Sequence, residues 1–168
     1  MESLAGRVAL ITGAGRGIGA ATALLLAENG VRLALASRRG ENPGVDDALV
    51  QACDVRDPAS VKAVVDATVE RFGRLDIVIG NAGVGGYGPF LEVPDDQIED
   101  MIDTNVKGLI YTMRAALPAL MNSDAADVVT VASEAGRRGL PKEAVYCSSK
   151  FAQVGLTRAL DHELRPLG

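Results

Sequence analysis

The glycine-rich stretch over residues 12–19, Thr-Gly-Ala-Gly-Arg-Gly-Ile-Gly, constrains the fold more than any other part of the sequence. It follows an apolar run at 8–11 and precedes an apolar-periodic segment at 20–29, so it predicts a strand, a tight turn and a helix. Without a Cβ, glycine lets the backbone turn sharply and lets a phosphate approach it closely. The free N–H groups and positive dipole end of the helix would face that anion. The expected contacts are Gly13, Arg16, Gly17, Ile18 and Gly19, the alternative being a loop that binds nothing.

The charge and composition of the chain argue against several classes of function. The chain has 168 residues, 48% of them hydrophobic, and a net charge of −5, which suits one soluble domain over residues 1–168. This acidic balance argues against nucleic acid as a partner, and no apolar run approaches the length of a membrane span. The two cysteines, Cys53 and Cys147, have no disulfide or metal-ligand spacing, and we expect a cytoplasmic protein. With His162 as the single histidine, expected on a helix surface, we expect no metal site.

Apolar runs alternate with helical patterns along the whole chain. Strands are predicted at 8–11, 31–36, 49–55, 75–79 and 127–132, and helices at 17–29, 58–73, 94–121 and 144–164. Near-continuous apolar strands that alternate with helices are typical of a parallel sheet covered on both faces. The sequence therefore predicts an α/β fold, a doubly wound parallel sheet of about five strands in three layers.

The connection between the second and third strands is unusually short. Only residues 40–48, including Pro43 and Gly44, are available to link two parallel strands. Such a crossover normally contains a helix and a dozen or more residues. We therefore expect either a bare loop or a single turn here.

Residues after the second strand indicate which dinucleotide would bind. A carboxylate at this place would bond the ribose hydroxyls of NAD, whereas an arginine would attract the 2′-phosphate of NADP. Ser37 is not acidic, and it is followed by Arg38 and Arg39; Arg16 in the glycine turn could reach the same phosphate. These residues favour NADP over NAD, the alternative being that the arginines are merely solvated.

Further residues that follow strands could complete a cofactor cleft, because ligands of such sheets bind outside the carboxyl ends of the strands. Asp54, at the end of the third strand with Val55 beside it, could accept a hydrogen bond from an adenine amino group. The small residues after the fourth strand would bring the backbone close to a cofactor ribose; they are Asn81, Ala82 and Gly83.

Three polar residues after the fifth strand suggest proton-transfer chemistry. Ser133 follows that strand, and Tyr146 and Lys150 are four positions apart on the last predicted helix, so they share one face. An ammonium near a phenol favours the phenolate, which would make Tyr146 a usable proton donor and acceptor near neutral pH. A lone Tyr-x-x-x-Lys pattern is weak evidence; its value comes from its position after Ser133 and the other strand-end features.

These motifs, taken in order, resemble the short-chain dehydrogenases/reductases over essentially the whole chain. The matching residues are Thr12-Gly13-x-x-x-Gly17-x-Gly19, Asn81-Ala82-Gly83, Asn105, Ser133, Tyr146 and Lys150. The resemblance implies a Rossmann-type fold and an NADP-dependent oxidoreductase that interconverts an alcohol and a ketone or aldehyde. It also implies a homo-oligomer formed through the helices at 94–121 and 144–164.

The resemblance implies a role for each catalytic residue. Tyr146 would transfer the proton at the substrate oxygen, while Lys150 would hold the nicotinamide ribose and favour the phenolate. Ser133 would hydrogen-bond the substrate oxygen, and Asn105 would hold a water that links Lys150 to solvent. Without the resemblance, Asn105 would be interpreted as an ordinary helix amide. The serines and cysteine between Tyr146 and Lys150 are interpreted as helix packing.

The chain departs from the family pattern in two places. One is the short second crossover; the other is the end, because family members continue into further strands and a segment that covers the substrate. We therefore expect an incomplete domain with missing C-terminal strands, an exposed valine-rich edge at 127–132 and weak activity. The alternative function is a catalytically inactive, nucleotide-binding or interaction remnant of such an enzyme.

Overall fold

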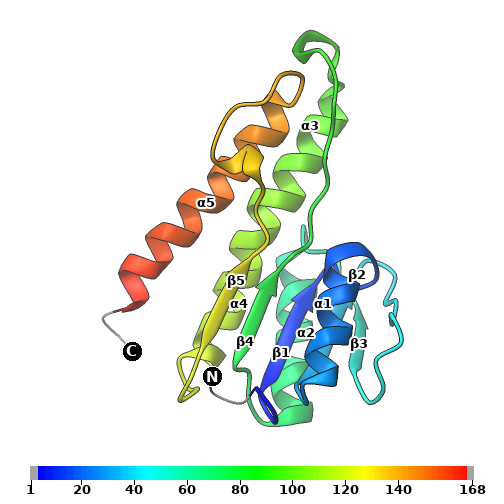
Figure 1. Cartoon of the computed structure of the whole chain (residues 1–168), viewed down its shortest axis with the longest axis vertical. Helices are drawn as coiled ribbons and strands as arrows, with labels where there is room; N and C mark the ends of the chain where they lie inside the picture. The colour runs from blue at the N-terminus through cyan, green and yellow to red at the C-terminus, as the bar shows by residue number, and fades with distance from the viewer. Residues whose placement is uncertain (1–3, 166–168) are drawn as a thin grey trace.

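The computed structural model describes residues 4–165, which form a five-stranded parallel sheet with helices on both faces (Figure 1). The strand order is β3-β2-β1-β4-β5, so connections leave the central strand β1 toward both edges. The strands are β1 (Val8–Thr12), β2 (Arg32–Ser37), β3 (Leu49–Ala52), β4 (Ile77–Gly80) and β5 (Asp127–Thr130). The longer helices are α1 (Gly17–Glu28), α2 (Pro58–Phe72), α3 (Asp95–Ile102), α4 (Gly108–Leu120) and α5 (Ala144–Leu164). The predicted α/β doubly wound architecture is confirmed.

Alternating side chains of the strands pack into two separate hydrophobic cores, one on each face of the sheet. Leu10 and Val78 pack with α2 and α4 on one face, and α5 adds Leu156 to this cluster. Ile11 and Ile79 pack on the opposite face, which α1 covers. Helix cover is uneven, because Val129 of β5 is 45% exposed on the edge of the sheet. The expected exposed valine edge is therefore present in the described chain.

Most predicted elements lie within a few residues of the observed ones. The third strand was expected to reach residue 55, but β3 ends at Ala52, because Cys53 and Val55 turn into the core beside α2. The fourth and fifth strands are shifted or shortened to Ile77–Gly80 and Asp127–Thr130. The second strand is displaced by one residue to Arg32–Ser37, and β1 extends to Thr12.

Residues 40–48 connect β2 to β3 as a loop without a helix. The Asn42 side chain accepts hydrogen bonds from the backbone N–H groups of Gly44 and Val45, which closes a tight turn. The Val45 side chain is buried in the α1-side core and so anchors the loop to the sheet. The buried Val45 side chain supplies packing here that a crossover helix would otherwise supply.

The helix predicted at 94–121 contains a π-helical turn. The turn η2 (Asp103–Lys107) lies between α3 and α4, and its end is marked by a hydrogen bond from Gly108 N–H to the Asp103 carbonyl. A π-helical turn inside an α-helix is rare and often accompanies a functional site. Within the described residues, no helix is both long and apolar enough to span a membrane.

Candidate active site

The glycine turn lies where the strand order reverses, between β1 and the start of α1. Gly13 has a φ of 66°, and an added Cβ would lie 2.9 Å from the Cα of Ala82. The Asn81 amide donates to the carbonyls of Thr12, at 2.9 Å, and Gly13, at 3.1 Å. The segment after β4 is thereby held directly against the glycine turn. Gly13, Asn81 and Ala82 therefore lie together, as the sequence predicts.

The N-terminus of α1 is open to an anion. Arg16 occupies the N-cap position with an extended backbone and makes no capping hydrogen bond, and the first turn contains no acidic residue. Gly17 has a φ of 59° and space on its Cα, while Ile18 is 65% exposed. Free N–H groups at a helix start bind phosphate without further devices. These residues fit the diphosphate of a dinucleotide.

A carboxylate that the sequence patterns did not reveal lies beside the glycine turn. Glu41 Oε2 accepts a hydrogen bond from Ser37 Oγ at 3.3 Å, and Glu41 N donates to the same Oγ at 3.0 Å. Its side chain also lies over Gly15, where an added Cβ would meet it. Ser37 is therefore buried, and its hydroxyl is hydrogen-bonded to Glu41. The short loop thus brings the negative charge of Glu41 between the ends of β1 and β2.

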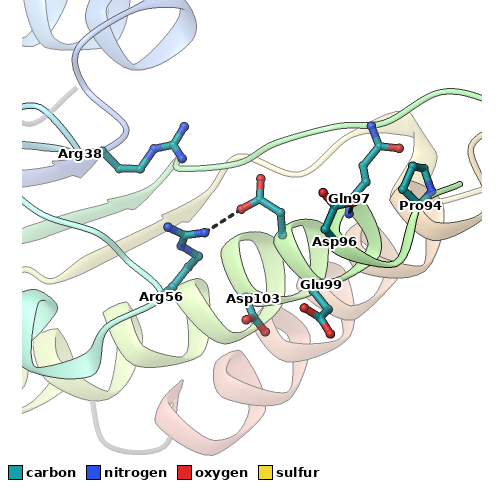
Figure 2. A pocket seen from close by; sticks show the side chains of 8 residues that line it. Arg38, Arg56, Pro94, Asp96, Gln97, Glu99 and Asp103 are labelled. Carbon is teal, nitrogen blue, oxygen red and sulfur yellow. Dashed lines mark hydrogen bonds and ion pairs between the residues drawn. The ribbon is translucent and has the colours of Figure 1, made fainter.

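A cleft of about 610 Å³ opens beyond the ends of β2 and β3 (Figure 2). Arg38 and Arg56 line one side of it, and the acidic residues of α3 line the other. Arg56 bridges Asp54, at 2.6 Å, and Asp100, at 3.0 Å. Hydrogen bonds from Arg56 lower the pKa of Asp54 despite its partial burial. Asp54, which was expected to meet adenine, is thus already paired with Arg56. Arg38 remains exposed.

Two other predicted cofactor contacts differ in their accessibility. Val55 is buried, and an added Cβ on Gly108 would meet its side chain, so Val55 supports the start of α4. Gly83 is exposed, and an added Cβ there would lie 3.2 Å from Asn105 Oδ1 and 3.7 Å from Lys150 Nζ. Gly83 therefore lets the backbone pass close to the predicted catalytic residues, where a side chain would be crowded by Asn105.

Asn105 is fully buried in the π-helical turn, at 0% exposure. Its Oδ1 accepts a hydrogen bond from Val84 N, and its Nδ2 donates to the Val84 carbonyl, both at 2.8 Å. Nδ2 also donates to Ser149 Oγ at 2.9 Å. Asn105 thus ties the segment after β4 to α5 through its hydrogen bond to Ser149.

Tyr146 and Lys150 lie on the same face of α5, as their spacing predicts. The Lys150 ammonium lies 5.6 Å from the centroid of the Tyr146 ring. Lys150 is only 5% exposed, and this burial lowers the pKa of its ammonium. An added Cβ on Gly85 would lie 3.5 Å from the Tyr146 ring. Tyr146 and Lys150 therefore lie close together, with Lys150 next to Gly83.

Ser133 follows β5 at the start of the short 3₁₀ turn η3 (Glu134–Gly136). Its Oγ accepts a hydrogen bond from Ala135 N at 3.2 Å, which leaves its own O–H free to donate. Ser133 caps η3, which packs against α5, the helix that carries Tyr146. Within residues 4–165, no three acidic, histidine or cysteine side chains are arranged to hold a metal ion.

Three residues of this region were not predicted from the sequence: Glu41, Ser149 and Gln153. Gln153 is a buried amide one turn after Lys150, in an otherwise apolar stretch of α5, which is the signal that could have identified it. Ser149 precedes Lys150 and is itself fully buried, at 0% exposure. Glu41 has no local signal, because only the path of the 40–48 loop brings it to Gly15.

Comparison with known proteins agrees with this geometry. The family model described as short chain dehydrogenase matches residues 7–168. A Streptomyces virginiae protein named as a ketoacyl reductase of the monensin polyketide synthase is 40% identical; the match covers 100% of this chain and 69% of that protein. A Mycobacterium tuberculosis protein named as an NAD-dependent oxidoreductase is 36% identical, with 99% and 69% covered.

Solved structures extend the comparison to the fold. A short-chain dehydrogenase/reductase of Burkholderia phymatum in complex with NAD superposes with a TM-score of 0.92 at 33% identity. The superposition covers 100% of this chain but 63% of that one, so this chain spans roughly two thirds of its relatives. A 3-ketoacyl-(acyl-carrier-protein) reductase of Brucella melitensis complexed with NADH gives 0.93 at 32% identity, with 98% and 73% covered. The chain therefore belongs to the short-chain dehydrogenase/reductase family.

Proposed function

We propose that this chain catalyses the interconversion of a small-molecule alcohol and a ketone or aldehyde with a nicotinamide dinucleotide. The observation that carries the proposal is the buried Lys150 ammonium, which lies 5.6 Å from the centroid of the Tyr146 ring and next to Gly83. The dinucleotide would supply the hydride in reduction and accept it in oxidation. Tyr146 would give the proton to the carbonyl oxygen in reduction, or take it from the alcohol in oxidation.

The remaining residues have supporting roles in this proposal. Ser133 would donate its free O–H to the substrate oxygen and so orient it toward Tyr146. Lys150 would hold a ribose hydroxyl and favour the phenolate of Tyr146. Asn105 would keep η2, the segment after β4 and α5 in register, so that these groups remain aligned.

We further propose that NADP is preferred over NAD. Arg16 and Arg38 are exposed near the glycine turn and the end of β2, and Ser37 offers no carboxylate to a ribose. Glu41 opposes a 2′-phosphate, but two guanidinium groups outnumber it. Hydrogen bonds to charged groups are worth about 1.5–3 kcal/mol, or roughly ten- to a hundredfold in affinity.

Titration of the purified chain with NADPH and NADH, followed by an assay with a panel of ketones, tests both proposals. We expect tighter binding of NADPH and reduction of at least one ketone. Equal affinity for the two cofactors would contradict the NADP preference. Cofactor binding without any turnover would instead support the alternative, an inactive nucleotide-binding module.

Self-association through α4 and α5 is also proposed. Phe151 on α5 is exposed beside a hollow of about 300 Å³, which Arg137, Val154 and Arg158 also line. An exposed aromatic ring next to a hollow favours contact with another protein surface. Sedimentation velocity should show a dimer for the parent chain and a monomer for Phe151→Glu; a monomeric parent would contradict this proposal.

A further inference from the structure

Gln153 is a buried amide that joins Lys150 to the π-helical turn. It lies on α5 one turn after Lys150 and is 1% exposed. Its Oε1 accepts a hydrogen bond from Lys150 Nζ at 2.9 Å, and its Nε2 donates to the main-chain carbonyl of Asn105 at 2.8 Å. Both ends of the amide are therefore hydrogen-bonded, one to Lys150 on α5 and the other to Asn105 in η2.

These hydrogen bonds determine where the Lys150 ammonium can point. An ammonium has three N–H donors. One goes to Gln153 Oε1, and a second goes to the carbonyl of Val131, after β5, at 3.1 Å. Two acceptors on two elements fix the Nζ position and leave the third donor for a ligand hydroxyl.

We infer that Gln153 is a positioning residue, which holds the Lys150 ammonium beside Tyr146 and couples it to the Asn105 turn. This inference rests on the proposed function, in which Lys150 serves Tyr146 and a ribose. Gln153 thus joins Lys150 to the main chain of Asn105 by direct side-chain hydrogen bonds.

The uncharged surroundings of Lys150 make this amide important for its charge state. Tyr146 is the titratable group that faces the ammonium from α5, whereas η2 contributes the Asn105 amide and the segment after β5 contributes a carbonyl. In the described part of the chain, Lys150 forms no ion pair with a carboxylate. The carbonyl dipole of Gln153 therefore compensates part of the desolvation of the ammonium.

The test is a pH titration of Lys150 in the full chain without cofactor. The titration is monitored by NMR of ¹³C-labelled lysine. Gln153→Leu removes the acceptor at similar volume, and we expect the Lys150 pKa to fall by about one unit, a tenfold loss in proton affinity. Gln153→Glu keeps an acceptor and adds a negative charge, so we expect a shift of the opposite sign. Thr157→Val is the matched control, because Thr157 lies one turn after Gln153 on α5 and hydrogen-bonds Thr130 and the main-chain carbonyl of Gln153, not the Gln153 side chain.

Shifts of opposite sign in the Leu and Glu variants, with none in Thr157→Val, would support the inference, because loss of packing would hydrate the ammonium and raise the Lys150 pKa in both variants. An unchanged Lys150 pKa in both folded variants would overturn the inference. If the Gln153→Leu variant does not fold, the Lys150 pKa of the Gln153→Glu variant decides alone. NADPH affinity of the parent is measured in parallel. Absence of cofactor binding would refute the proposed function, whereas the lysine titration would still decide the role of Gln153.

Discussion

The two halves of the candidate site are built in opposite ways. On the β4–β5 side, Asn105, Lys150 and Gln153 are buried, and uncharged amides and carbonyls hold the one charge among them. On the β2–β3 side, Arg38, Glu41 and Arg56 are exposed charged groups. Buried hydrogen bonds cannot be replaced by water, whereas exposed charges are screened and hydrated. The first side should therefore control geometry and rate, and the second should tune ligand choice.

The largest expected effect is on the β4–β5 side. Tyr146→Phe removes only the proton-transferring hydroxyl, so we expect kcat to fall by about 10²- to 10⁴-fold with little change in cofactor affinity. Steady-state assays with a ketone substrate and a parallel cofactor titration measure both quantities. Tyr111→Phe on α4 is the matched control. A Tyr146→Phe variant that keeps most of its kcat would refute the mechanism.

Asn105→Ala should show how far this side depends on buried hydrogen bonds. The change leaves the Val84 N–H, the Val84 carbonyl and Ser149 without their partner. We expect the free energy of unfolding to fall by about 3 kcal/mol, measured by urea denaturation. Asn122→Ala, at an exposed helix end, should change it by less than about 0.5 kcal/mol. Similar losses in both variants would remove the contrast between the two sides.

Cofactor choice should change on the β2–β3 side without loss of fold. Arg38→Ala should weaken NADPH binding by roughly ten- to a hundredfold, because it removes a charge-assisted contact to the 2′-phosphate. The double variant Ser37→Asp and Arg38→Ala should reverse the preference toward NADH. Arg114→Ala, an exposed arginine on α4, is the control for net charge. Unchanged NADPH affinity in Arg38→Ala would place the phosphate elsewhere.

Glu41 should have a smaller effect of the opposite sign. Its carboxylate lies beside Gly15 and would repel a 2′-phosphate, so Glu41→Gln should tighten NADPH binding by about two- to fivefold at low salt. The gain should shrink at high salt, because the charge is exposed. Glu28→Gln, at the other end of α1, should leave the affinity unchanged. Weaker NADPH binding in Glu41→Gln would show that the carboxylate bonds the ribose instead.

The smallest effect is expected at the partly exposed pair of Arg56 and Asp54. The folded-state pKa of Asp54 is lowered, so its contribution is present above the unfolded value of about 3.9 and is lost as pH falls through the folded value. Arg56→Ala should cost less than about 1 kcal/mol at pH 7 and remove this acid-dependent loss. Lys62→Ala, which breaks another exposed ion pair, is the control in urea denaturation at pH 7 and pH 3. A pH dependence unchanged in Arg56→Ala would contradict this account.

Local sequence determined the parallel sheet and the framework of the site. Continuous apolar runs and helical periodicity located all five described strands to within a few residues. The glycines at 13 and 17 adopt positive φ, and the four-residue spacing of Tyr146 and Lys150 sets both on one face of α5. These features depend on neighbours in the chain, which is why the sequence pattern reveals them.

Tertiary structure alone decided which polar groups meet across elements. Glu41 reaches Gly15 because Val45 anchors a loop that has no helix, and Gln153 reaches Asn105 because α5 packs on a π-helical turn. Each contact joins residues that are distant in sequence, and its strength depends on burial that no local pattern encodes. The sequence thus specified the chemical groups of the site, and packing determined how their charges are compensated.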